Sequence, residues 1–144
     1  MTGGDPFDLD RFVGAQSASY AAALSEIRAG RKRTHWIWFV FPQVRGLGQS
    51  ATSEHFGISG ISEAHAYLQH PVLGPRLVQC AEALLALKGT TASAIMPYPD
   101  DLKLCSSMTL FERAAGPGSV FSRVLERYYG GRRDERTLEL LGSP

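Results

Sequence analysis

The sequence predicts an all-α fold, a compact single-domain bundle of six or more short helices. Apolar residues recur at the spacing of amphipathic helices in several segments, and glycines or prolines separate these segments. No segment shows the sustained alternation of polar and apolar residues that is typical of half-buried strands. The length of 144 residues suits one domain, so we expect a single domain over residues 1–144.

The N-terminal region predicts an amphipathic helix that begins near Asp5. We expect either Gly14 or the pair Gln16 and Ser17 to divide it, and Gly30 to end it, as glycine commonly does at a helix C-terminus. A basic cluster at residues 31–33 follows, where positive charge complements the helix dipole.

The segment HWIWFVF, residues 35–41, is apolar almost without interruption. Periodicity therefore does not separate a strand from a buried helix, and a minor β contribution near residues 35–41 stays open. The loop VRGLGQS comes next, and its glycines permit a positive backbone φ. Ser50 or Thr52 can then cap a short helix that ends at Phe56.

Cap residues and closing glycines predict the helices of the second half of the chain. Residues 76–88 have the clearest helical spacing of apolar side chains, and Gly89 follows them. The other expected helices run from Ser62 to His70, from a Thr91 cap over a short segment, from an Asp100 or Asp101 cap to Gly116, over residues 120–129, and from an Asp134 cap toward the C-terminus.

Composition limits the classes of partner. The formal net charge is +1, so no overall field attracts nucleic acid or a membrane surface, and we expect neither as a partner. No apolar run approaches the roughly 18 residues of a membrane span, and the acidic N-terminus does not resemble a signal peptide. Cys80 and Cys105 stand alone in apolar surroundings, which indicates free thiols and a cytoplasmic location. The oligomeric state is left open.

Four motifs, in order, carry a family resemblance. They are HWIWFVFPQ, GLGQS, EAHAYLQHPVLGPRL and DDLKLCSSMTLF. With them the chain, over about residues 5–141, resembles a bacterial family known as domain of unknown function 1810. Its members often carry the name calpastatin, which belongs to a disordered inhibitor of unrelated composition. The resemblance implies a mainly α-helical domain and implies no activity.

The aromatic motif is the first candidate for a ligand site. Trp36 and Trp38 lie between two polar residues, His35 and Gln43. These large rings suit a hydrophobic core, but the indole N–H groups and the polar ends also suit a platform on which a planar ring stacks. Both interpretations stay open, and one tryptophan can serve the core while the other serves a pocket.

The glycine loop is the second candidate. Gly46 and Gly48 free backbone amides just before a helix that Ser50 caps, and Arg45 lies beside them. Such amides can bind an anion such as phosphate. The alternative is an ordinary turn, because the spacings of the phosphate-binding and dinucleotide-binding loops are absent.

The third candidate is a pair of groups on one helix face. Lys103 and Ser107 are four residues apart, so a desolvated lysine can activate the hydroxyl as a nucleophile, with Ser106 close by. Alternatively, Lys103 pairs with Asp100 and the serines bond back to their own helix. Glu54, four residues after the cap of the preceding loop, is a candidate carboxylate near the same site or part of a solvated helix face.

These candidates support two hypotheses of different classes. The first is a small-ligand pocket protein, with a lean toward a hydrolase that cleaves a glycosidic bond in a nucleotide-type, ADP-ribose-like substrate. The second is a non-enzymatic protein-interaction module with a basic patch that meets an acidic partner. The four histidines lack metal-ligand spacing, so we expect no metal, and nothing predicts a cofactor. The basic patch of the second hypothesis would join residues 31–33 to Arg132, Arg133 and Arg136.

Overall fold

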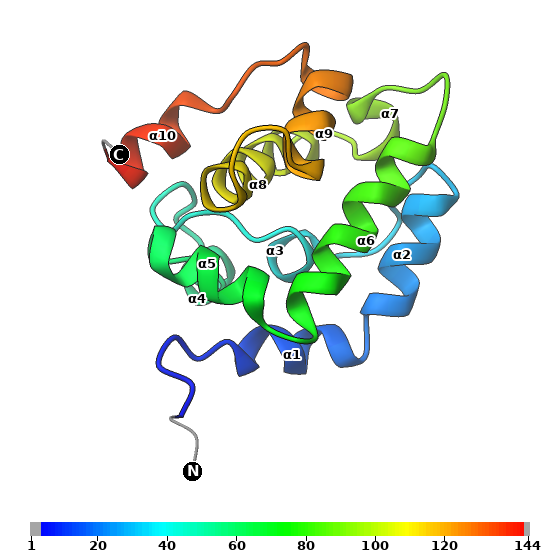
Figure 1. Cartoon of the computed structure of the whole chain (residues 1–144). Coiled ribbons are helices and arrows are strands. Elements are labelled where there is room, and N and C mark those ends of the chain that lie inside the picture. Colours follow the sequence, from blue (N-terminus) through cyan, green and yellow to red (C-terminus); the bar gives the residue numbers. More distant parts are fainter. Residues whose placement is uncertain (1–3, 143–144) are drawn as a thin grey trace.

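Helix α8 (Asp100–Ala115) lies at the centre of the fold, and most other helices pack around it (Figure 1). Its neighbours include α3 (Ile37–Val40), α5 (Ile61–Gln69) and α9 (Val120–Tyr129). Helix α6 (Leu73–Ala86) packs against α9 and α5. The buried residues of α8 lie between Leu104 and Ala114, whereas its first turn, residues 100–103, is partly exposed.

This computed structural model describes residues 4–142, and within that range it contains ten helices and no strand. The predicted all-α fold is therefore confirmed. The helices not yet given are α1 (Asp10–Ser17), α2 (Tyr20–Arg28), α4 (Ala51–His55), α7 (Ala92–Ile95) and α10 (Glu135–Leu141). None of the helices in the described range is long and apolar enough to cross a membrane.

Several helix ends follow the predicted local chemistry. Ser50, Thr91 and Asp134 are the caps of α4, α7 and α10, and their side chains accept hydrogen bonds from backbone amides three residues on, at 3.0–3.1 Å. Gly116 follows α8 and Gly130 follows α9, both with positive φ. The N-terminal helix is divided after Ser17, as expected.

Two predicted caps are wrong. Helix α5 begins at Ile61, so Ser62 lies inside it, and the first-turn residue Glu63 instead accepts hydrogen bonds from the amide and hydroxyl of Ser59, both at 2.8 Å. Helix α8 has Pro99 at its N-cap rather than an aspartate. The Asp100 carboxylate is engaged by two lysines, described below, and does not cap the helix.

The aromatic segment forms a helical turn, not a strand. Ile37 to Val40 make the single turn α3, so the open β contribution near residues 35–41 is not realised. The turn lies between α1 and α8, and its Ile37, Val40 and the following Phe41 are buried. An isolated parallel bridge between Val44 and Ile58 is the nearest approach to a sheet in the described range.

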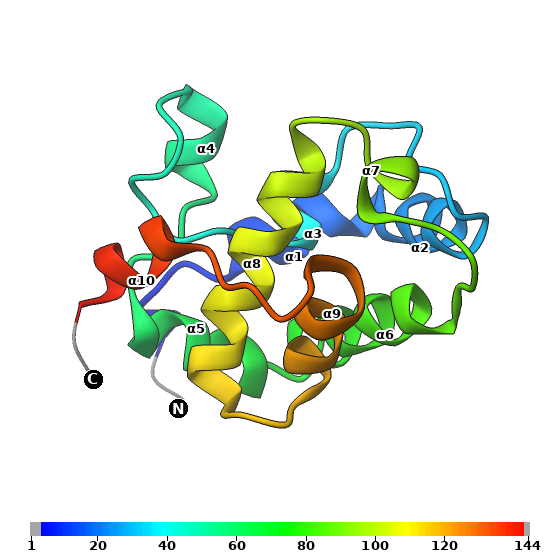
Figure 2. The ribbon, with the colours of Figure 1, turned by 90° about the horizontal axis from the view of Figure 1, so that it is seen from above.

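This bridge closes the base of a projecting segment, residues 45–57, which we call the α4 arm. At its base, Arg45 donates its backbone N–H to the Ile58 carbonyl at 2.8 Å. Figure 2 shows α4 standing away from the rest of the molecule, and none of its residues is buried. The arm is therefore held at its base and exposed at its tip.

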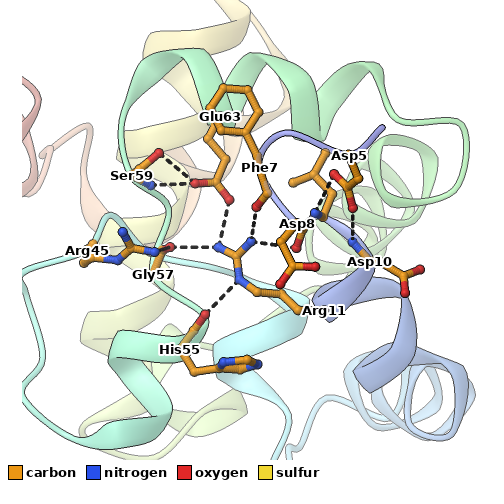
Figure 3. A network of polar contacts seen from close by, with 11 residues as sticks. Asp5, Phe7, Asp8, Asp10, Arg11, Arg45, His55, Gly57, Ser59 and Glu63 are labelled. Atoms are coloured by element: carbon orange, nitrogen blue, oxygen red, sulfur yellow. Dashed lines mark hydrogen bonds and ion pairs between the residues drawn. The ribbon is translucent and has the colours of Figure 1, made fainter. Parts of the chain in front are cut away.

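Arg11 of α1 fixes the returning end of the α4 arm (Figure 3). Its guanidinium donates to the carbonyls of His55 and Gly57 at 2.8 and 2.9 Å and pairs with the Glu63 carboxylate at 2.8 Å. The side chains of Arg11 and Glu63 are 7% and 2% exposed. Such a buried pair is stable only with further hydrogen bonds, and Arg11 supplies them to the carbonyls around it.

Candidate ligand-binding cleft

An open cleft of about 330 Å³ lies between the α4 arm and the N-terminal part of α8. Trp38 and Gln43 come from the aromatic motif, and Lys103 comes from α8. The remaining lining residues come from the arm, from α8 and from the cap of α10; they are Leu47, Gly48, Gln49, Ser50, Ser53, Pro99, Leu102, Ser106 and Asp134. The wall is thus part apolar and part hydroxyl, amide and charge.

The indole of Trp38 carries a cation over its ring. Lys103 Nζ lies 5.0 Å from the ring centroid, a cation–π distance. The same ammonium lies 3.6 Å from Oδ1 of Asp100, whose other oxygen pairs with Lys32 at 2.8 Å. Lys32 is 7% exposed and Lys103 is 28% exposed, so Lys103 is the cation of this trio that solvent and a ligand can reach.

The arm approaches the cleft through a position where only glycine fits. A Cβ atom at Gly48 would lie 2.6 Å from Oγ and 2.8 Å from Cβ of Ser53. Both residues line the cleft and also a small neighbouring cavity whose wall includes Phe56. The glycine therefore lets the loop fold tightly back onto α4.

Asp134 closes the cleft on the side of α10. The turn before it is tied to α8, because Arg133 pairs with Glu112 and the backbone N–H of Asp134 donates to Thr109 Oγ1 at 2.9 Å. Glu112 also accepts a hydrogen bond from Ser122 at 2.6 Å. Its pKa is lowered, mainly by the hydrogen bond from Arg133, so the tie is charged at neutral pH.

The structure brings five of the predicted site residues to this cleft. Three of them, Trp38, Gln43 and Lys103, come from the aromatic motif and α8, and the glycine loop contributes Gly48 and Ser50. The six others do not line it; they are His35, Trp36, Arg45, Gly46, Glu54 and Ser107.

Burial separates the two tryptophans. Trp36 is 1% exposed, and its Nε1 donates to Glu26 Oε1 at 2.8 Å, which makes it a core residue with its polar atom satisfied. Thr34 donates both its amide and its hydroxyl to the same Glu26 carboxylate, at 3.0 and 2.6 Å. His35, between them, is exposed and outside the cleft.

The predicted catalytic trio does not converge. Ser107 is fully buried, and its Oγ has no hydrogen-bond partner in the described part of the chain. Glu54 is exposed on α4 without lining the cleft. Ser106, three residues after Lys103 rather than four, is the α8 serine in the wall, and its hydroxyl donates to the Leu102 carbonyl at 3.2 Å.

The two remaining loop residues serve the arm itself. Arg45 donates from its guanidinium to the Gly57 carbonyl at 3.1 Å, across the base of the arm. Gly46 has φ of +106° and lies near Leu140 of α10, so its place is structural.

Sequence reasoning did not assign Ser53 and Asp134 to the site. The cap motif predicted that Asp134 begins a helix, and nothing local indicates that this helix starts beside α8. Ser53 could have been predicted, because it lies three residues after the cap Ser50, whose side chain accepts a hydrogen bond from the Ser53 amide. Among residues 4–142 no cluster of histidine, cysteine and acidic side chains is arranged to hold a metal.

Fold and cleft together define an all-α, single-domain protein with an open, partly polar surface cleft. The chain belongs to the family described as protein of unknown function (DUF1810), which matches residues 6–141, so the resemblance carried by the motifs is confirmed. It is also similar to the crystal structure of the conserved hypothetical protein Rv1873 from Mycobacterium tuberculosis, with 54% sequence identity and a TM-score of 0.95. That match covers 97% of this chain and 100% of the other. No curated protein matches the sequence.

Proposed function

We propose that the protein binds a small ligand of nucleotide type in the cleft between the α4 arm and α8. The observation that carries the proposal is convergence: Trp38, Gln43, Ser50 and Lys103 belong to three separate motifs and line one cleft. An indole offers a surface for a planar base, and amide and hydroxyl groups offer hydrogen bonds. The volume is near the lower end of the roughly 300–1,000 Å³ of ligand sites, which suits a mononucleotide or one half of an ADP-ribose-like ligand.

Lys103 is the group that favours an anionic ligand. The Asp100 carboxylate is already paired at 2.8 Å with the buried Lys32, and its contact with Lys103 is longer, at 3.6 Å. A phosphate that approaches Lys103 therefore meets an ammonium with hydrogen-bond capacity left. The ammonium also lies over Trp38, so its engagement changes the surroundings of that indole.

The geometry supports binding better than glycosidic hydrolysis. Most glycoside hydrolases place two carboxyl groups on either side of the scissile bond. Among the described residues that line the cleft, Asp134 is the one carboxylate. Hydrolysis of an ADP-ribose-like substrate stays a prediction, which chromatography of the ligand after prolonged incubation with the protein would check.

Tryptophan fluorescence tests the binding proposal. AMP, ADP and ADP-ribose, each titrated into the protein, are expected to change the emission of Trp38 and to raise the melting temperature. A ligand at a hundredfold excess over its Kd adds about 2.7 kcal/mol to the stability of the folded state. No change in emission and in melting temperature with any of the three would refute the proposal.

Two variants locate the response. Trp38→Phe should remove the ligand-dependent change in emission, whereas Trp36 is buried in the core and serves as the unresponsive internal reference. Lys103→Met keeps the alkyl length and loses the charge, so it should weaken binding while the fold is kept. A response that persists unchanged in Trp38→Phe would place the ligand elsewhere.

The interaction module remains the second candidate, with a smaller basic surface than its sequence suggests. Lys32 is buried in its pair with Asp100, and Arg133 pairs with Glu112. The exposed cations left for an acidic partner are Arg31, Arg33 and Arg132, with Arg136 3.5 Å from Glu139. Binding of an acidic peptide that is lost on charge reversal at Arg31 and Arg33 would favour this candidate.

The free thiols Cys80 and Cys105 support the predicted cytoplasmic location in either case.

A further inference from the structure

We propose that Asp134 is a specificity residue of the cleft and accepts hydrogen bonds from the sugar hydroxyls of a ribonucleotide. This inference rests on the proposed function and goes beyond it, because it names the part of the ligand that the α10 side of the cleft recognises. It predicts that the protein distinguishes ribose from 2′-deoxyribose.

The first support is the division of labour within the Asp134 carboxylate. Oδ2 accepts the hydrogen bonds that cap α10, from the backbone N–H of Thr137 at 3.0 Å and from its hydroxyl. Oδ1 has no hydrogen-bond or ion-pair partner among residues 4–142. One oxygen therefore holds the side chain in place, and the other has hydrogen-bond capacity left on a residue that lines the cleft.

The second support is that the position of Asp134 is fixed from two sides. Its backbone N–H is bound to Thr109 Oγ1 at 2.9 Å, and Thr109 in turn donates to the Cys105 carbonyl at 2.8 Å. The preceding Arg133 donates from Nε to Glu112 Oε1 at 2.9 Å. A hydrogen-bond acceptor held in this way loses little entropy when a ligand binds, which favours selective recognition.

The third support is that two elements contribute opposite charges to the wall of the cleft. Lys103 provides a cation on α8, whereas Asp134 provides an anion on the side of α10. A phosphate is attracted to the first and repelled by the second, so the neutral, hydroxyl-bearing part of a nucleotide is the part that suits Asp134. Carboxylates bind the ribose 2′-hydroxyl in this manner in dinucleotide sites on other folds.

The experiment compares AMP and ADP with their 2′-deoxy counterparts by the Trp38 emission assay. In the unmodified protein the ribonucleotides should bind about tenfold or more tightly, the effect of one hydrogen bond to a charged acceptor. In Asp134→Asn that preference should fall severalfold, because the asparagine oxygen is taken by the cap and the remaining NH2 group makes only a neutral hydrogen bond to the sugar hydroxyl. Asparagine is as good a helix cap as aspartate, so α10 is expected to persist, which circular dichroism verifies.

A matched control removes a neighbouring charge outside the cleft. Glu135 is exposed and follows Asp134 directly, so Glu135→Gln changes the net charge by the same amount. It should keep the ribose preference. Loss of the preference in both variants would show a general charge effect and overturn the assignment.

The remaining outcomes are also decisive. Equal affinity of ribo- and deoxyribonucleotides for the unmodified protein would overturn the role of Asp134 and leave the proposed function standing. A preference that survives in Asp134→Asn at its full size has the same meaning. If none of the nucleotides binds, the proposed function fails and this inference fails with it. An Asp134→Asn variant that binds both classes of nucleotide more weakly by the same factor keeps the preference and would also overturn the assignment, because Asp134 then contacts a part of the ligand other than the 2′-hydroxyl.

Discussion

Replacement of Glu26 by glutamine should lower the free energy of unfolding at neutral pH. It should also remove the part of the loss of stability in acid that comes from protonation of the Glu26 carboxylate. The Glu26 carboxylate accepts hydrogen bonds from the Trp36 indole, from the Thr34 hydroxyl and from the backbone amides of Arg33 and Thr34, at 2.6–3.0 Å. Partial burial by itself raises its pKa, but the hydrogen bonds led by that of Thr34 outweigh burial and lower the pKa from 4.5 to about 2.

The magnitude follows from this displacement. Each pKa unit corresponds to about 1.4 kcal/mol, so lowering the pKa of Glu26 from 4.5 to about 2 contributes at most about 3–4 kcal/mol to the free energy of unfolding at neutral pH. Solvent screening at a partly exposed site reduces the expected value to roughly 1–2 kcal/mol. Because the pKa is lower in the folded state than in the unfolded state, this contribution is complete above a pH of about 4.5 and is lost as the pH falls toward about 2.

The assay is urea unfolding, followed by circular dichroism at about pH 7 and about pH 3. The difference in unfolding free energy between the unmodified protein and Glu26→Gln should be largest at neutral pH and fall by roughly half or more at the acidic pH. Replacement of the exposed Glu82 by glutamine is the control, with no comparable difference at either pH. A difference for Glu26→Gln that stays constant with pH would refute the charge-based explanation.

Three further predictions concern buried groups. Arg11→Met should lower the free energy of unfolding by about 3–5 kcal/mol in urea titrations, because it leaves Glu63 buried and unpaired; Arg11→Met combined with Glu63→Gln should recover part of that loss. Ser107→Ala should be neutral or stabilising by up to about 1 kcal/mol in thermal melts and leave ligand binding unchanged, because the Ser107 hydroxyl is buried without a partner in the described residues; a loss of binding would restore it as a site residue. Burial raises the pKa of the Cys80 thiol to about 12 and that of Cys105 to about 11, so alkylation of the native protein at about pH 8 should be far slower than that of the urea-unfolded protein, as mass spectrometry would show.

Most helix ends could be predicted because their chemistry is local. The caps Ser50 and Thr91 and the closing Gly116 need only residues within one turn, and the sequence displays all of them. The errors at Ser62 and Asp100 have a different origin. In both cases a charged side chain near the helix start is engaged from a distant segment, Glu63 by Arg11 and Asp100 by Lys32.

The candidate site was predictable in part for the same reason. The pattern could name Trp36 and Trp38 as alternatives for core and pocket, but the choice depends on Glu26, which lies on another helix and binds the first of them. Residues three and four after Lys103 both lie near its helix face, so spacing alone could not prefer Ser106 to Ser107. The packing of α5 and α9 against α8 decides which of the two serines faces the core.

The construction of the α4 arm has a consequence for how members of this family can diverge. Its two ends are joined by the Val44–Ile58 bridge, and Arg11 holds the returning end, whereas α4 contributes no buried residue to the core. Insertions or deletions at its tip change only the entropy of closing a surface loop, which grows slowly with loop length. The width and chemistry of one cleft wall can therefore be altered by selection, or by a protein engineer, at little cost to the helices that carry Lys103 and Asp134.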